Sequence, residues 1–152
     1  MKMIILIIIV VAVFSALGLW LGVYGNSAPG ENNSMSYGIS MSTDKMSYSV
    51  GEPIIITLKI FNYTEEEITF HFNTGQRYDF IIEDEEGSKI WRWSEDKMFT
   101  MALGEETLKP TNPEIIFKAE YKGKLSLGYY KITGIFVAQD KPMSGNVIII
   151  VK

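Results

Sequence analysis

The chain has 152 residues, a formal net charge of −4 and 47% hydrophobic residues, and it contains no cysteine. The lack of cysteine excludes disulfide bonds, thiol catalysis and cysteine-ligated metal sites. Acidic and basic residues are interspersed without a basic stripe, so we expect no nucleic acid partner.

The N-terminal segment, residues 1–24, predicts where the protein is located. Residues 3–23 form an almost unbroken apolar run that follows Lys2. As a helix, this run would be about 31 Å long, close to the hydrocarbon thickness of a bilayer. We expect one N-terminal transmembrane helix, retained as a signal anchor in the cell membrane. Lys2 favours a cytoplasmic N-terminus, which would make the body of the protein extracytoplasmic. The alternatives are a cleaved signal with a secreted body, although residues 25–28 match a cleavage site poorly, and a buried core helix.

The rest of the chain predicts a linker and then a β domain. Residues 25–36 contain Gly, Asn, Ser and Pro and predict a flexible linker. Turn signals separate short strands expected near residues 37–43, 53–62, 67–73, 78–84, 88–93, 114–121, 128–138 and 145–151. Residues 105–108 predict one short turn at most. This pattern is typical of an all-β, immunoglobulin-like antiparallel β-sandwich, which we expect over residues 37–152.

The strands at 78–84 and 88–93 predict a β-hairpin that turns at Gly87. Trp91 and Trp93 are two residues apart, so both rings leave the same face of their strand. Because two indoles bury a large area, we expect them to fill the interior and their strand to be central to the fold. Arg92 points the other way and is expected to pair across the hairpin, with residue 79 or 83 as its partner.

This hairpin carries a family resemblance. The motif Tyr78-Asp79-Phe80, followed after the turn by Trp91-Arg92-Trp93-Ser94, resembles the BsuPI family, named for an intracellular serine-proteinase inhibitor of Bacillus. Weaker similarities lie at Val50-Gly51-Glu52-Pro53, Leu108-Lys109-Pro110 and Gly128-Tyr129-Tyr130. The resemblance covers roughly residues 40–152. It implies a domain that binds and inhibits a serine protease of the subtilisin type.

The segment after the tryptophans is a candidate recognition loop. Its residues are Ser94, Glu95, Asp96, Lys97, Met98 and Phe99. An inhibitor needs a rigid loop, because a preorganised loop loses little entropy on binding. Without disulfides, we expect the rigidity to come from Trp93 and Phe99 packed beneath the loop. Lys97 or Met98 would then occupy the specificity pocket of the protease. This assignment comes from the residues and is not implied by the resemblance.

The sequence predicts no catalytic, cofactor-binding or metal site. The one histidine, His71, falls at a polar position of a predicted strand and is interpreted as a solvated side chain. No nucleophile elbow, zinc-protease motif, P-loop or dinucleotide fingerprint is present. The acidic runs at 65–67 and 83–86 predict solvated turns rather than a calcium site. Asn32 and Asn62 fit the N-glycosylation pattern.

Two other functions stay open for the predicted domain. The first is a non-inhibitory envelope module that binds another protein or a glycan. The second is a scaffold in a larger assembly, for which Trp93→Ala would unfold the domain without a separable binding defect.

Overall fold

The computed structural model describes residues 36–152. The predicted anchor and nearly all of the predicted linker lie outside these residues. The described part contains ten β-strands: β1 (Tyr37–Thr43), β2 (Ser47–Tyr48), β3 (Ile54–Asn62), β4 (Ile68–Phe72), β5 (Tyr78–Glu83), β6 (Lys89–Arg92), β7 (Gly104–Leu108), β8 (Glu114–Tyr121), β9 (Gly128–Phe136) and β10 (Met143–Val151). Between residues 36 and 152, no helix is long and apolar enough to cross a membrane.

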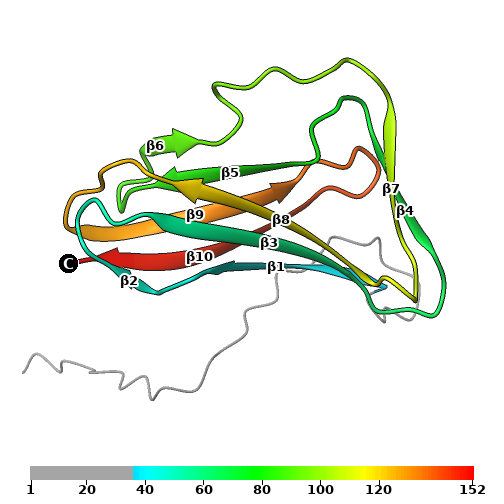
Figure 1. The fold of residues 1–152 in the computed structure, drawn as a ribbon, viewed down its shortest axis with the longest axis horizontal. Helices are drawn as coiled ribbons and strands as arrows, with labels where there is room; N and C mark the ends of the chain where they lie inside the picture. Colours follow the sequence, from blue (N-terminus) through cyan, green and yellow to red (C-terminus); the bar gives the residue numbers. More distant parts are fainter. Residues whose placement is uncertain (1–35) are drawn as a thin grey trace, which may run out of the picture.

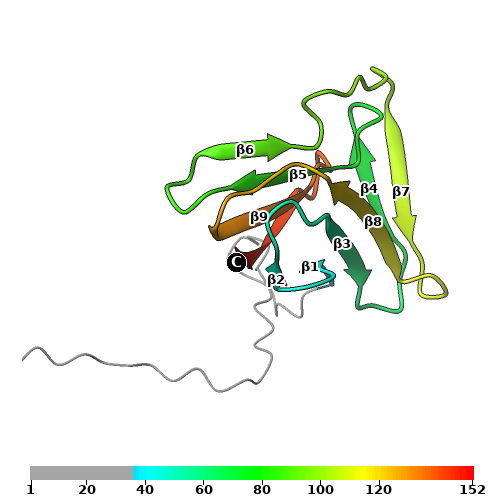
Figure 2. The ribbon, with the colours of Figure 1, turned by 60° about the vertical axis from the view of Figure 1, so that its left-hand side comes forward.

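The strands form two facing sheets and a small third one. The first sheet has the order β1-β3-β8 and the second the order β2-β10-β9-β5-β6 (Figure 1). The two-stranded β4-β7 sheet stands at one end of the sandwich, at the right of Figure 2. All pairs are antiparallel except the short parallel pair of β2 with β10. The predicted all-β antiparallel sandwich is thus confirmed for the described residues.

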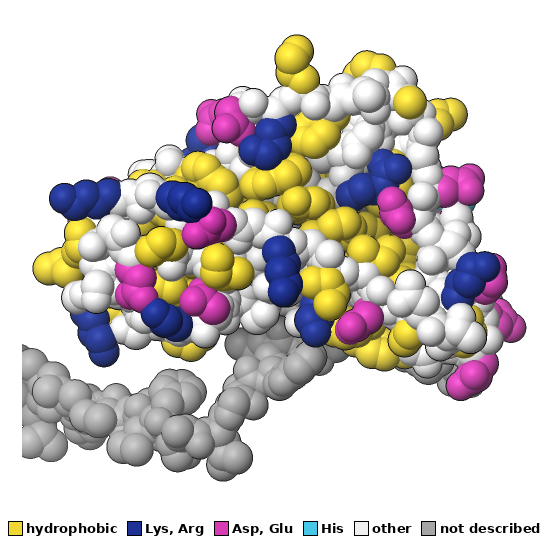
Figure 3. All heavy atoms as spheres, viewed as in Figure 1, with side chains coloured by type: hydrophobic (Ala, Val, Ile, Leu, Met, Phe, Trp, Pro, Cys, Tyr) yellow, Lys and Arg dark blue, Asp and Glu magenta, His cyan; other side chains and the backbone are white. Residues whose placement is uncertain are grey.

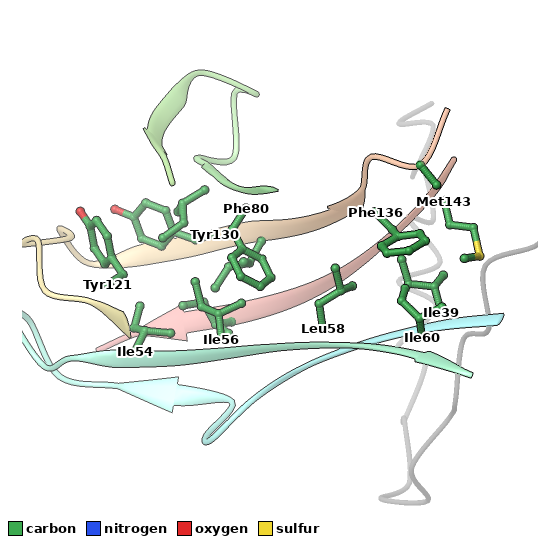
Figure 4. Packing of buried hydrophobic residues seen from close by; sticks show 14 of the residues in the cluster. Ile39, Ile54, Ile56, Leu58, Ile60, Phe80, Tyr121, Tyr130, Phe136 and Met143 are labelled. Carbon is green, nitrogen blue, oxygen red and sulfur yellow. The ribbon is translucent and has the colours of Figure 1, made fainter. Parts of the chain in front are cut away.

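The core lies between the two large sheets and follows from strand alternation. In β3 every second residue is buried, because successive side chains point to opposite faces of a strand. Ile54, Ile56, Leu58 and Ile60 therefore face the second sheet, where they meet Phe136 and other side chains (Figure 4). Each such burial stabilises the fold by about 1.5–3 kcal/mol.

Aromatic contacts close one side of the sandwich, between the edge strands β6 and β8. Tyr78 stacks on Phe117 with ring centroids 4.6 Å apart, and Trp91 lies 5.2 Å from Tyr121. We call this side of the sandwich the β6–β8 side. In the space-filling view, hydrophobic side chains form a band across this part of the surface (Figure 3).

The prediction that the tryptophan strand is central was wrong. β6 pairs only with β5 and forms the edge of its sheet, with Ile90 and Arg92 exposed. Trp91 and Trp93 are partly buried and pack against the core from its margin. The periodicity placed both rings on one face, but it carries no information about which strands lie at an edge.

Two strands were missed by the sequence prediction. β7 lies where a short turn was expected, and it pairs with all five residues of β4. Its one buried side chain is Leu108, so it lacks the apolar alternation that reveals a strand. The strand is held in place by its antiparallel pairing with β4 and by the contact between the Thr69 and Thr107 hydroxyls at 2.9 Å. β2 has only two residues and is too short to be recognised by pattern.

Candidate functional site

The connection between β6 and β7, residues 93–103, is the most exposed apolar part of the described chain. It arches over one edge of the sandwich (Figure 1). We call it the β6–β7 loop. Its side chains Met98, Met101 and Leu103 are 96%, 89% and 84% exposed. Hydrophobic side chains project from the same edge in the space-filling view (Figure 3). Because most large apolar side chains prefer burial, such a group is a candidate contact surface.

A buried carboxylate fixes the start of this loop. Asp79 is completely buried at the beginning of β5. Its Oδ1 accepts hydrogen bonds from the backbone N–H groups of Phe80 at 2.9 Å and Ser94 at 3.1 Å. Its Oδ2 accepts from Arg92 Nε at 2.6 Å and from the Ser94 hydroxyl at 2.7 Å. Four donors therefore satisfy this buried charge, which is the condition for keeping an ionised group inside a protein.

The Trp93 ring forms the floor of the first half of the loop. The Trp93 backbone N–H donates to the Phe80 carbonyl at 2.9 Å, which ties the residue to β5. One contact of the indole is the Tyr78 ring, with centroids 4.3 Å apart, and another is the Phe99 ring at 6.0 Å. Lys97 Nζ lies over the same indole, 4.7 Å from its centroid. The predicted packing of Trp93 and Phe99 beneath the loop is therefore present in the structure.

Further contacts hold the second half of the loop. The Thr100 carbonyl accepts the Gly75 N–H at 2.8 Å. Arg77 Nε donates to Glu106 Oε1 at 2.9 Å, just after the loop ends. The Arg77 guanidinium also lies against Gly104, where a Cβ would collide with Nη2. A larger residue at position 104 would therefore make the Arg77 guanidinium move.

The short segment 75–79 thus braces the β6–β7 loop along its length. Asp79 holds Ser94, Tyr78 supports Trp93 and Gly75 holds Thr100, while Arg77 lies against Gly104, the residue that follows the loop. These contacts restrain the loop in a chain that has no cysteine and therefore no disulfide bonds.

The structural motif residues predicted from the sequence, Tyr78, Asp79, Phe80, Trp91, Arg92 and Trp93, all belong to the β5–β6 pair and its exit. Of the two partners predicted for Arg92, the structure gives Asp79. Glu83 pairs instead with Lys131 at 2.7 Å. Sequence reasoning missed Gly75, Thr100 and Arg77, because their role depends on contacts between segments far apart in the chain.

A surface hollow of about 650 Å³ lies where the β6–β7 loop ends. It is lined by His71, Phe72, Leu103, Gly104, Glu105, Gln139 and Asp140. His71 is half exposed, and its Nδ1 lies 2.9 Å from Asp140 Oδ2 while its Nε2 lies 3.4 Å from Glu105 Oε1. Burial alone would raise the pKa of the Asp140 carboxyl, but hydrogen bonds from Lys141 and His71 outweigh it and lower the pKa below its usual range. Since both its ring nitrogens face carboxylates, His71 links β4, β7 and the β9–β10 connection.

The acidic runs form turns. Asp84 Oδ1 accepts the N–H groups of Glu86 and Ser88 at 3.0 and 2.8 Å, which shapes the β5–β6 turn. Gly87 adopts the positive φ of 82° expected at that turn. Within residues 36–152, no group of three or more histidine, aspartate or glutamate side chains is arranged to hold a metal ion.

Asn62 has a structural role. Its side chain is buried, and Nδ2 donates to the carbonyls of Glu66 at 2.7 Å and Leu108 at 3.2 Å. Oδ1 accepts the N–H and the hydroxyl of Thr64, both at 2.8 Å. A glycan on Nδ2 would replace one of its two N–H donors and would need space that this buried side chain does not have, so the structure gives Asn62 a role in folding. Asn32 lies outside the described residues.

Comparison with protein families decides the relationship that the hairpin motif suggested. The family model BsuPI, described as an intracellular proteinase inhibitor, matches residues 41–141. The chain belongs to the BsuPI family. The match runs from β1 to the end of the β9–β10 connection and includes the whole β6–β7 loop with its braces. The domain is therefore of the proteinase-inhibitor type.

Other comparisons are less informative. A search of curated proteins finds no match. Among solved structures, the chain is similar to Spo0M, a sporulation control protein from Bacillus subtilis, with 13% identity and a TM-score of 0.48. That alignment covers 77% of this chain and 49% of Spo0M, so the chain spans about half the length of that protein. A CARDB domain of Pyrococcus furiosus gives 9% identity and a TM-score of 0.43, covering 76% of this chain and 87% of that one. We draw no functional argument from similarities this weak.

Proposed function

We propose that the domain binds and inhibits a serine protease of the subtilisin type through the β6–β7 loop, with residues 94–99 entering the cleft of the enzyme. The observation that carries this proposal is the combination of exposed apolar side chains with braced backbone. Met98 is almost fully exposed, while Ser94 and Thr100 on either side are hydrogen-bonded to segment 75–79.

The bracing matters because it reduces the cost of binding. Ordering one flexible side chain at an interface costs about 0.5–1.5 kcal/mol, and ordering a backbone residue costs about 1–2 kcal/mol. A loop whose backbone is already fixed avoids much of this loss. Fixed backbone also opposes the strain that a protease must impose to cleave the chain. Both effects support inhibition rather than digestion.

We further propose that residues 3–23 anchor the protein in the cell membrane, with residues 25–36 as a tether and the inhibitory domain extracytoplasmic. The apolar run and Lys2 support this location. A cleaved signal and a secreted domain form the alternative. Digestion of intact cells by an added protease, followed by detection of the domain, would separate an external from a cytoplasmic domain. Fractionation of membranes and medium would then separate the anchored from the secreted form.

A non-inhibitory interaction module of the envelope is the second candidate. It is favoured by exposed apolar side chains outside the loop, namely Ile90 on β6 and Ile116 on β8, 44% and 42% exposed. Both lie on the edge strands of the β6–β8 side. An unpaired edge strand can accept an extended segment of a partner.

Inhibition is tested by titrating the full chain, purified in detergent, into a subtilisin-type protease and measuring residual activity. We expect stoichiometric loss of activity. The variant with Lys97 and Met98 both replaced by glycine should lose most of its inhibition. The matched control replaces Lys124 and Leu127 by glycine, in a loop between β8 and β9, and should inhibit normally. Inhibition that survives the Lys97 and Met98 replacements would remove the loop assignment, and full protease activity with the unaltered chain would favour the interaction module.

A further inference from the structure

The two side chains that could enter a protease pocket, Lys97 and Met98, are in different states. Lys97 Nζ is 2.8 Å from Asp96 Oδ1 and lies over the Trp93 indole at 4.7 Å, and its side chain is only 34% exposed. Its positive charge is therefore already engaged within the domain. Met98 is 96% exposed and is free of such contacts. The sequence could not separate these neighbours, and the structure does.

Met98 is also bracketed by its two neighbours. Lys97 before it and Phe99 after it both lie against the Trp93 ring. With both flanking side chains held on one floor, the side chain between them projects away from it. This is the geometry needed to place one residue in a deep pocket while its neighbours stay against the inhibitor. Met101 and Leu103 lack this arrangement, because both follow the Thr100 anchor and Leu103 lines the hollow beside His71.

We infer that Met98 is the specificity-determining residue of the loop and that the target protease has an apolar primary pocket. This inference rests on the proposed inhibitory function. A thioether side chain is unbranched and flexible, so it fits a hydrophobic slot. A protease that selects basic residues has a carboxylate at the base of its pocket, as trypsin does, and leaves that carboxylate unpaired when methionine enters. Lys97 could pair its ammonium group with that carboxylate only by leaving both Asp96 and the Trp93 ring.

The test measures inhibition constants of the full chain against a subtilisin-type protease, chymotrypsin and trypsin. The variants are Met98→Gly, Met98→Lys, Lys97→Met, Met101→Gly and, as a matched control in the β8–β9 connection, Leu127→Gly. The two proteases with apolar pockets should be inhibited at least about 10-fold more strongly than trypsin. Met98→Gly should weaken that inhibition by about 10- to 100-fold, the loss expected for one apolar side chain in a pocket. Leu127→Gly should change it by less than about 3-fold, and Lys97→Met and Met101→Gly should each weaken it less than Met98→Gly does. Met98→Lys should shift the preference toward trypsin.

Other outcomes overturn the inference. Preferential inhibition of trypsin that disappears in Lys97→Met would assign the pocket residue to Lys97 and leave the inhibitory function intact. Equal loss in Met98→Gly and Met101→Gly would mean a broad apolar contact without one specificity residue. If the unaltered, folded chain inhibits none of the three enzymes, the proposed function fails together with the inference. Because Met98 is almost fully exposed, its variants should keep the thermal unfolding midpoint of the unaltered chain, which verifies folding.

Discussion

The Ser94 hydroxyl donates a hydrogen bond to the buried carboxylate of Asp79 at 2.7 Å, across 15 positions of the chain. This contact joins the start of β5 to the first residue of the predicted recognition loop. It gives a structural reason for two polar residues of the hairpin motif, Asp79 before the turn and Ser94 after the tryptophans. The Asp79 carboxylate accepts hydrogen bonds from Arg92 at the end of β6 and from Ser94 just after it.

Asp79→Ala should therefore destabilise the fold and loosen the loop together. The change leaves the Phe80 and Ser94 donors without their acceptor in a buried place, and Arg92 without its counter-charge. We expect a loss of about 3 kcal/mol in the free energy of unfolding, measured by urea denaturation. Asp96→Ala is the control, since this carboxylate is 83% exposed and should change stability by less than about 0.5 kcal/mol. Equal effects of both variants would show that Asp79 does not organise the corner.

Gly75→Ala should weaken inhibition more than it weakens the fold. A Cβ at this position would stand 2.6 Å from Thr100 Oγ1, so the Thr100 side chain must move and disturb the anchor of the second half of the loop. Inhibition should weaken by about 10-fold, while the unfolding free energy falls by less than about 1 kcal/mol, because the turn is exposed. Adding Thr100→Ala removes the clashing oxygen and should restore inhibition. A double variant that inhibits no better than Gly75→Ala would refute the role of this contact.

Asn62→Ala should destabilise the fold although the sequence marks this residue only as a glycosylation pattern. The change removes four hydrogen bonds that tie the end of β3 to the following turn and to β7. We expect a loss of about 2 kcal/mol by urea denaturation. Asn146→Ala, at an exposed position of β10, should cost less than about 0.5 kcal/mol. A loss at Asn62 as small as that at Asn146 would contradict the structural role.

Stability should fall in alkaline solution partly because of Tyr48. Burial, together with the hydrogen bond from Tyr48 Oη to Asp44, raises the pKa of this phenol from 10.0 to about 12. A group whose pKa is raised in the folded state stabilises fully below its unfolded pKa and loses that contribution as the pH rises. The loss should therefore occur between pH 10.0 and about 12. Burial raises the pKa of Tyr78 and Tyr121 as well, so their contributions have the same sign.

Tyr48→Phe isolates this contribution. Near neutral pH the variant should be less stable by about 1 kcal/mol, because it lacks the hydroxyl that bonds Asp44. Urea denaturation at about pH 9 and about pH 11.5 should show this difference shrinking as the pH rises, since only the unaltered chain has this phenol to ionise. A difference that stays constant or grows would show that the Tyr48 environment is not as described.

The sequence predicted most of the fold because most strands alternate clearly. β3 buries every second residue, and its bounds of 54–62 differ by one residue from those predicted. β7 could not be found in this way, because it is held in place by pairing with β4 and not by an apolar alternation of its own. The edge position of β6 could not be found either, because it depends on whether another strand pairs with the side of β6 that faces away from β5. For the site, the sequence placed Trp93 and Phe99 beneath the loop but not the braces at Gly75 and Arg77. Such braces depend on how close two distant segments approach, and a single sequence contains no direct signal for that.

The most direct test of inhibition by a braced loop is the isolation of its complex with the protease. The full chain is mixed with an equimolar amount of a subtilisin-type enzyme and separated by size, and the mass of the recovered chain is measured along with residual activity. The account predicts an inactive complex of one enzyme with one intact, uncleaved chain. Fully active enzyme that elutes apart from the chain, or a chain cleaved within residues 94–99 while the enzyme stays active, would contradict it.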